Sequence, residues 1–202
     1  LSQKHIEFIR GLFTKEQIQI PQGFTEQDVN LLAKRLFSDI FYLRYIRNMS
    51  KGGLVTYGRI LQNVYRQDIR SFYAECLTDT LELDTNATMI LLEKGLAIRP
   101  PVIPYPQKLE FVHKQSFILE GLGRREALTG TEITCLYANV LSNHLGVAIA
   151  TAFSQVAQSK KVRKYFLRGK DVSLKHIKVL CSYLEMDSLG FPMAFEQEVT
   201  DS

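Results

Sequence analysis

A repeated segment constrains the fold of this chain more than any other feature of its sequence. Residues 2–6 read SQKHI and residues 173–177 read SLKHI, so four of five positions are identical at an offset of 171 (176 − 5). The same offset relates Pro21 to Pro192 and Phe24 to Phe195. Because each copy of an internal repeat forms one structural unit, we expect two related units in the chain.

A second, weaker repeat defines what the unit is. Residues 68–72 (DIRSF) align with residues 161–165 (KVRKY), and Gly53 aligns with Gly146, at an offset of 93 (146 − 53). On both sides of a short break, apolar residues recur at steps of three and four, which is the period of an α-helix. The repeated unit is therefore a helical hairpin, and two hairpins with helices of about 25 residues build an antiparallel four-helix bundle.

The same periodicity predicts five long helices. Ser38, Asp68 and Thr129 are expected to be N-caps, because their short polar side chains can accept the free backbone N–H groups of a first turn. Gly95 is expected just after a helix end, where a left-handed residue is needed. The expected helices are residues 1–19, 38–66, 68–94, 129–157 and 160–187.

The pair Gly52-Gly53 lies in the middle of the second expected helix. Each glycine in a helix interior costs about 1 kcal/mol relative to alanine, so the pair needs a reason. A close helix–helix contact or a kink is the favoured explanation. Space left for a ligand inside the bundle is the alternative.

Composition places the chain among ordinary globular proteins. It has 202 residues, of which 46% are hydrophobic and 23% charged, and a net charge of +4 that neither demands nor excludes an acidic partner. Its three cysteines are widely spaced, which favours buried thiols and a cytoplasmic location over disulfides. No run of about 18 apolar residues predicts a membrane span. Leu1 falls inside a helical pattern, so we expect a fragment of a longer protein.

A proline-rich segment predicts the domain boundary. Residues 99–106 hold four of the six prolines in the chain. Such a segment is extended and semi-rigid, and a spacer is favoured over a PxxP peptide ligand. The expected domains are a first helical bundle without its first helix (1–101), a linker with a short helix around 112–119 (102–128), and the first hairpin of a second bundle (129–202).

Several stretches of the chain resemble a known family. Residues 2–8, 20–31, 36–39, 95–101 and 153–157 are similar, in the same order, to a Bacillus family catalogued as domain-of-unknown-function family 3231. The resemblance implies an all-α fold of duplicated ferritin-like four-helix bundles, without an established activity. It also suggests a cytoplasmic, spore- or stress-associated role, because such families occur in spore-forming bacteria.

Ferritin-like bundles often hold two metal ions through a Glu-x-x-His pair on facing helices. The chain departs from that pattern, because Ser2 and Ser173 occupy the positions three residues before the repeated His5 and His176. A metal site for Fe, Mn or Zn remains the alternative to a histidine hydrogen-bonded within the core, which is favoured. Its candidate ligands are His5, Glu75 and Glu82 in the first bundle, and His144 and His176 in the second, where helix rise puts the two histidines within about 3 Å of the same level.

A cluster of six cations (Lys160, Lys161, Arg163, Lys164, Arg168 and Lys170) opens the last expected helix. Cations at a helix N-terminus oppose the helix dipole, so an anionic partner such as a phosphate, lipid headgroup or nucleic acid is one explanation. A solvated basic face is the favoured one, and no specific nucleic-acid motif is present.

No nucleotide-binding or hydrolase motif is present either, and the sequence therefore favours an interaction or assembly role. Further chain segments or a homo-oligomer would cover the exposed apolar seam.

Overall fold

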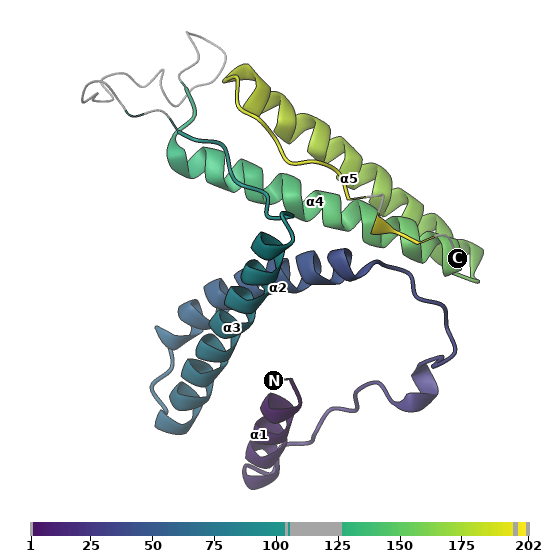
Figure 1. The fold of residues 1–202 in the computed structure, drawn as a ribbon. Coiled ribbons are helices and arrows are strands. Elements are labelled where there is room, and N and C mark those ends of the chain that lie inside the picture. Colours follow the sequence, from purple (N-terminus) through teal and green to yellow (C-terminus); the bar gives the residue numbers. More distant parts are fainter. Residues whose placement is uncertain (1, 104, 106–126, 196–197, 201–202) are drawn as a thin grey trace. The chain divides into compact units, whose positions relative to one another are not determined.

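The computed structural model describes residues 2–103, 105, 127–195 and 198–200. Within these residues the helices are five α-helices and one short 3-10 helix (Figure 1). The predicted all-α fold with about five long helices is therefore confirmed, while the ferritin-like assignment stays a prediction. The short helix expected around 112–119 lies outside the described residues.

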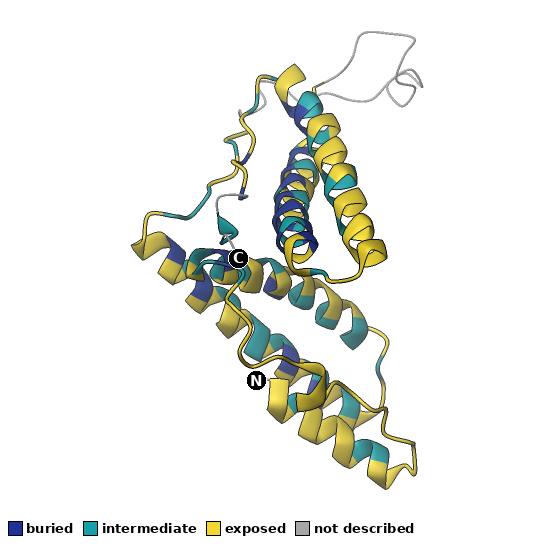
Figure 2. Cartoon of the chain, turned by 90° about the vertical axis from the view of Figure 1, so that its right-hand side faces the viewer, coloured by how far each residue is buried: buried dark blue, intermediate teal, exposed yellow. Residues whose placement is uncertain are grey.

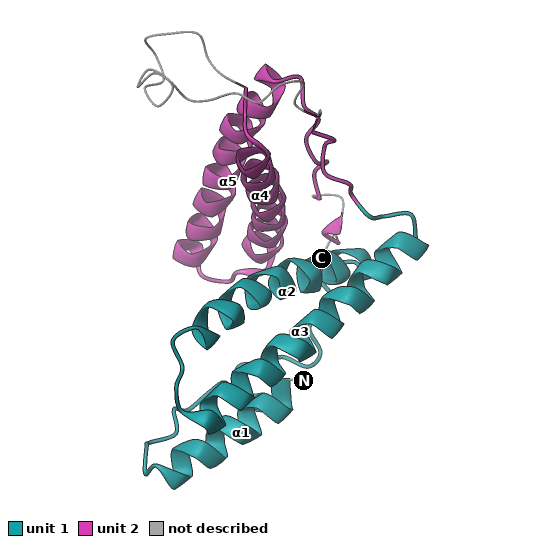
Figure 3. Cartoon of the chain, turned by 90° about the vertical axis from the view of Figure 1, so that its left-hand side faces the viewer, with its two compact units in different colours: residues 1–97 teal, residues 98–202 magenta. Residues whose placement is uncertain are grey.

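The chain divides into two compact units, which we call unit 1 (residues 1–97) and unit 2 (residues 98–202) (Figure 3). Unit 1 contains α1 (Ser2–Lys15), the 3-10 helix η1 (Glu26–Asp28), α2 (Asp39–Leu61) and α3 (Gln67–Glu93). Unit 2 contains α4 (Gly130–Val156) and α5 (Lys160–Met186). The division falls just before the proline-rich segment.

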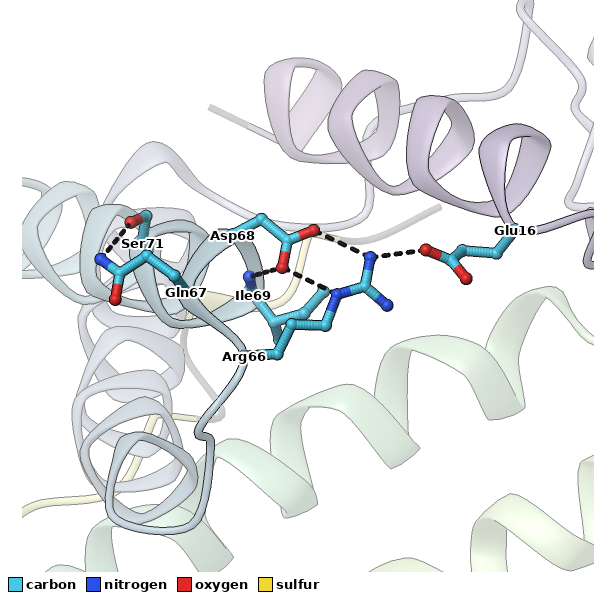
Figure 4. A network of polar contacts seen from close by, with 6 residues as sticks. All are labelled: Glu16, Arg66, Gln67, Asp68, Ile69 and Ser71. Atoms are coloured by element: carbon cyan, nitrogen blue, oxygen red, sulfur yellow. Dashed lines mark hydrogen bonds and ion pairs between the residues drawn. The ribbon is translucent and has the colours of Figure 1, made fainter.

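Two predicted N-caps are confirmed and one is wrong. The side chains of Ser38 and Thr129 accept the backbone N–H groups of Phe41 and Glu132, respectively. Helix α3 instead begins at Gln67, with Arg66 as its N-cap. Asp68 lies in the first turn, where its carboxylate accepts from the Arg66 guanidinium at 2.8 Å (Figure 4).

Helix α2 ends at Leu61, earlier than the expected Arg66. The Arg70 guanidinium donates to the carbonyl oxygens of Leu61 at 2.8 Å and Val64 at 3.1 Å. These bonds satisfy carbonyl groups that would otherwise need a further helical turn. The early end is therefore stabilised by a side chain from the following helix.

Three helices end with the same backbone turn. The residues Gln17, Gly95 and Ser188 have φ values of 57°, 66° and 55° and lie just beyond α1, α3 and α5. The next N–H in each case bonds a carbonyl five residues back, from Ile18 to Phe13, from Leu96 to Leu91 and from Leu189 to Leu184, at 2.8–2.9 Å. This is the Schellman arrangement. It ends α1 at Lys15, so the predicted extension to residue 19 is wrong.

The three turns show the repeats in three dimensions. Ser188 lies 171 residues after Gln17 and 93 residues after Gly95 (188 − 17 and 188 − 95), which are the two sequence offsets. A Cβ on Gly53 would lie 3.0 Å from Thr80, and one on Gly146 would lie 3.1 Å from Ser173. Thr80 and Ser173 are again 93 residues apart (173 − 80), so the two hairpins share one helix–helix contact. Tandem duplication is confirmed.

Helix α1 packs along α3 in the opposite direction. Glu16 pairs with Arg66, the N-cap of α3, at 2.6 Å. Phe8 stacks on Phe72 with ring centroids 4.4 Å apart. Because contacts nearer the start of α1 fall further along α3, the two helices are antiparallel.

Burial differs sharply between the helices (Figure 2). Helix α1 has no buried residue, whereas α4 has ten. The core of unit 2 contains Ile133 and Val140 of α4 with Cys181 and Leu184 of α5. Of the helices in the described ranges, α4 is long and apolar enough to cross a membrane by length and composition alone, and 44% of its most apolar window is buried within the structure.

Candidate functional site

The histidine of the first repeat lies between α1 and α3. The His5 Nε2 atom is 3.1 Å from Asp79 Oδ2, and the two side chains are only 18% and 16% exposed. The imidazole also meets the Phe72 ring edge-on, with centroids 5.7 Å apart. An aromatic face and a carboxylate therefore fix the orientation of this ring.

A second ion pair lies beside the first. The Lys4 ammonium pairs with the Glu75 carboxylate, which raises the pKa of Lys4 through their hydrogen bond. Glu75 and Asp79 are four residues apart on α3, so both face α1 from successive turns. Consecutive residues of α1 thus bind two carboxylates of one α3 face.

The candidate metal ligands of unit 1 are distributed differently from the expected set. His5 meets Asp79, Glu75 meets Lys4, and Glu82 is exposed on α3. Sequence reasoning missed Asp79. The signal that could have found it is its spacing of one helical turn from Glu75, which becomes informative only once α1 is known to lie antiparallel to α3.

The two histidines of unit 2 have different surroundings. His144 is buried on α4, and its ring meets the edge of Phe195 with centroids 5.8 Å apart. His176 is exposed on α5, and its Nδ1 atom is 3.3 Å from the Asn143 carboxamide oxygen. His144 and His176 were expected at a similar level along the hairpin. The contact agrees with this expectation, because Asn143 directly precedes His144 on α4. The side chains nevertheless point to different neighbours.

His176 lines an open groove of about 610 Å³ along α4 and α5. Two cations, two carboxamides and three apolar side chains share its walls, with one carboxylate among them. The groove therefore has the chemistry to take an anionic group beside an apolar one. The lining residues are Asn139, Asn143, Arg168, Asp171, Val172, Lys175, His176, Val179 and Leu180.

In the part of the chain that the structure describes, no group of three or more His, Cys, Asp or Glu side chains could hold a metal ion. The pair His5–Asp79 offers two suitable donors. Structural zinc takes four protein ligands and catalytic zinc three, so this pair alone is too small a set. Fe, Mn and Zn would need further donors from elsewhere.

The basic run at the start of α5 is a largely exposed surface. Lys160, Lys161 and Lys164 are exposed, and the Arg163 guanidinium donates to the carbonyl oxygen of Ala157 at 2.9 Å. That bond caps the last turn of α4, which is a structural role. Arg168 differs from its neighbours because it also lines the groove.

Comparison with known proteins gives one match. The family described as "Protein of unknown function (DUF3231)" matches over residues 1–109 and 116–202. Two matched segments fit the tandem arrangement of the chain. Neither the comparison with curated proteins nor the comparison with solved structures yields a match.

Proposed function

We propose that this chain, which belongs to the DUF3231 family of proteins of unknown function, serves an interaction or assembly role in which its helical units bind further helices. The observation that carries the proposal is an apolar face of unit 1 that is exposed, whereas its repeat counterpart in unit 2 is partly buried against a core. In unit 2, Ile177 and Leu180 of α5 pack against the core shared with α4. Their counterparts on α1 are Ile6 and Ile9, which are 56% and 37% exposed.

The connection after α1 supports the same proposal. Phe195 is 4% exposed and contacts His144, whereas its repeat counterpart Phe24 is 98% exposed. Leu31 and Leu32 are also exposed at 84% and 93%. Apolar surface gains about 25 cal/mol per Å² when it leaves water, so docking of a helix with the character of α4 onto α1 would be favourable.

Sedimentation velocity over a wide concentration range tests the proposal. The average mass of the chain should rise with concentration, and Ile6→Asn combined with Ile9→Asn should weaken that association. Val102→Asn is the control, because Val102 is an equally apolar exposed side chain in the segment after α3. A single monomeric species at all concentrations, or association unchanged by the α1 variant, would contradict the proposal.

Metal binding is the second candidate function, and the His5–Asp79 pair is the observation that favours it. A helix docked beside α1 would have to bring the missing donors. Elemental analysis of the purified assembly should then find stoichiometric Fe, Mn or Zn that is lost in Asp79→Asn and retained in Glu82→Gln. Absence of metal from the associated form would reject this function while leaving the assembly role intact.

We also propose that the assembly role is exercised in the cytoplasm. Cys76, Cys135 and Cys181 are all free thiols in the structure, which suits a reducing compartment.

A further inference from the structure

We propose that the groove along α4 and α5 binds an acidic amphipathic helix, whose two carboxylates one turn apart pair with Lys175 and His176. The proposal rests on the assembly role above and deepens it, because it names the chemistry of a partner helix. It comes from comparing what the two copies of the repeated Lys-His pair touch.

Unit 1 shows this interaction already made. Lys4 of α1 pairs with Glu75, and His5 pairs with Asp79 through its Nε2 atom. One turn further along α1, Phe8 stacks on Phe72. The acidic face of α3 thus recognises a Lys-His-x-x-apolar pattern on the helix opposite.

The counterparts of these α1 residues all line the groove in unit 2. At the offset of 171 they are Lys175, His176 and Val179, and each belongs to the groove wall. The shape of the surface defines the groove and sequence identity defines the repeat, so the two features are independent. Their coincidence identifies the groove as the position in which a helix could lie against α5 as α3 lies against α1.

The charges of the groove suit such a helix. Arg168 and Lys175 carry two positive charges against the single negative charge of Asp171. Asn143 contacts the Nδ1 atom of His176, so this contact does not use the Nε2 atom. In unit 1, Nε2 is the atom through which His5 contacts Asp79. The amide groups of Asn139 and Asn143 each donate to a backbone carbonyl of α4 at 2.8 Å, and each has a second N–H that can donate to a carboxylate. Val172, Val179 and Leu180 supply the apolar part of the contact.

Pairing of α5 with α5 of a second copy fits poorly. At the offset of 93, Arg168 and Val172 stand where α3 has Glu75 and Asp79. A second α5 would therefore bring an arginine toward Lys175, and like charges at close range repel. The occupant is instead a helix with the acidic pattern of α3.

A peptide of residues 67–93, labelled with a fluorophore, is a direct probe of this groove. Titration with the full chain should show saturable binding by fluorescence anisotropy, together with a gain of helical circular dichroism. Lys175→Ala and His176→Ala should each weaken binding about three- to tenfold, and high salt should weaken it further. Lys178→Ala is the matched control, because Lys178 is an exposed cation of the same helix outside the groove wall.

The peptide carries the complementary test. Replacing Glu75 by Gln and Asp79 by Asn in the peptide should abolish the response to Lys175→Ala and His176→Ala. A peptide with Glu75→Lys should bind the Lys175→Glu chain better than the unmodified chain. This charge exchange remains informative even if one variant lowers the helicity of the free peptide, because the rescue depends on the pair.

Three outcomes would overturn the proposal: no binding, binding unaffected by the groove variants, or a loss of binding as large in Lys4→Ala as in Lys175→Ala. The last result would place the peptide on α1 in competition with α3. Because the sedimentation experiment depends on Ile6 and Ile9, an assembly that persists without peptide binding would reject only the acidic-helix partner. Failure of both experiments would reject the assembly role as well.

Discussion

The same two residues have different partners in the two copies of the repeat. Lys4 and His5 are held by Glu75 and Asp79, whereas Lys175 and His176 line an open groove. Local sequence is nearly identical, so the difference comes from the helix that each pair faces. At the scale of single residues, identical side chains therefore have different roles because their neighbours differ.

Exposure predicts which of the three thiols reacts. Cys135 is exposed, whereas Cys76 is 1% and Cys181 is 7% exposed, and burial raises the pKa of both buried thiols. Because the thiolate is the nucleophile, a thiol reagent should label Cys135 rapidly in the native chain and the other two only after denaturation. Mass spectrometry of labelled peptides measures this. Fast native labelling of Cys76 or Cys181 would contradict the burial described.

The stability that the N-terminus of α4 contributes to the fold should depend on pH in the acid range. Hydrogen bonds from the backbone N–H and hydroxyl of Thr129 to Glu132 hold the pKa of that carboxyl below its ordinary value. A lowered pKa in the folded state contributes stability above the unfolded pKa, about 4.3 for glutamate, and this contribution is lost as pH falls through the folded pKa. Thr129→Ala should cost about 1 kcal/mol at neutral pH.

Urea unfolding at a series of pH values measures both effects. Glu132→Gln keeps the shape of the side chain but removes the charge, so its stability should vary less with acid pH than that of the unmodified chain. Equal pH dependence in the two proteins would show that the carboxylate of Glu132 is not responsible.

At the scale of elements, two adjacent glycines of α2 have different surroundings. A Cβ on Gly53 would lie 3.0 Å from Thr80, whereas one on Gly52 would meet nothing within 4 Å. The close contact predicted for the pair therefore belongs to Gly53. Gly52 lies in the same helix, but no close contact there requires a glycine.

The pair gives a matched substitution experiment. Gly52→Ala should stabilise the chain by about 0.5–1 kcal/mol, because alanine loses less backbone entropy in a helix. Gly53→Ala should give no gain or a loss, since the added methyl crowds the Thr80 methyl. Urea unfolding measures both, and Thr80→Ser should relieve the crowding because it removes the Thr80 methyl group, which is the atom nearest the added Cβ. A stabilising Gly53→Ala in the original background would show that the helices can separate at this point.

At the scale of the whole molecule, the chain consists of two units with their own cores. Leu184 is fully buried in unit 2, and Phe72 contacts His5 and Phe8 in unit 1. Truncating a buried leucine or phenylalanine to alanine costs about 2–5 kcal/mol. Leu184→Ala should therefore speed hydrogen exchange in α4 and α5 with little effect on α2 and α3, and Phe72→Ala should do the reverse. Uniform acceleration across both units in either variant would contradict separate cores.

The sequence by itself determined the all-α fold, the duplication, two of the N-caps and the Gly95 turn. These features depend on hydrogen bonds and apolar spacing within a few residues, which the chain carries locally. Only the tertiary structure decided that Asp79, and not Glu82, meets His5, and that Phe195 is buried while Phe24 is exposed. Such contacts depend on the direction and rotation of one helix against another, and packing between distant segments sets both.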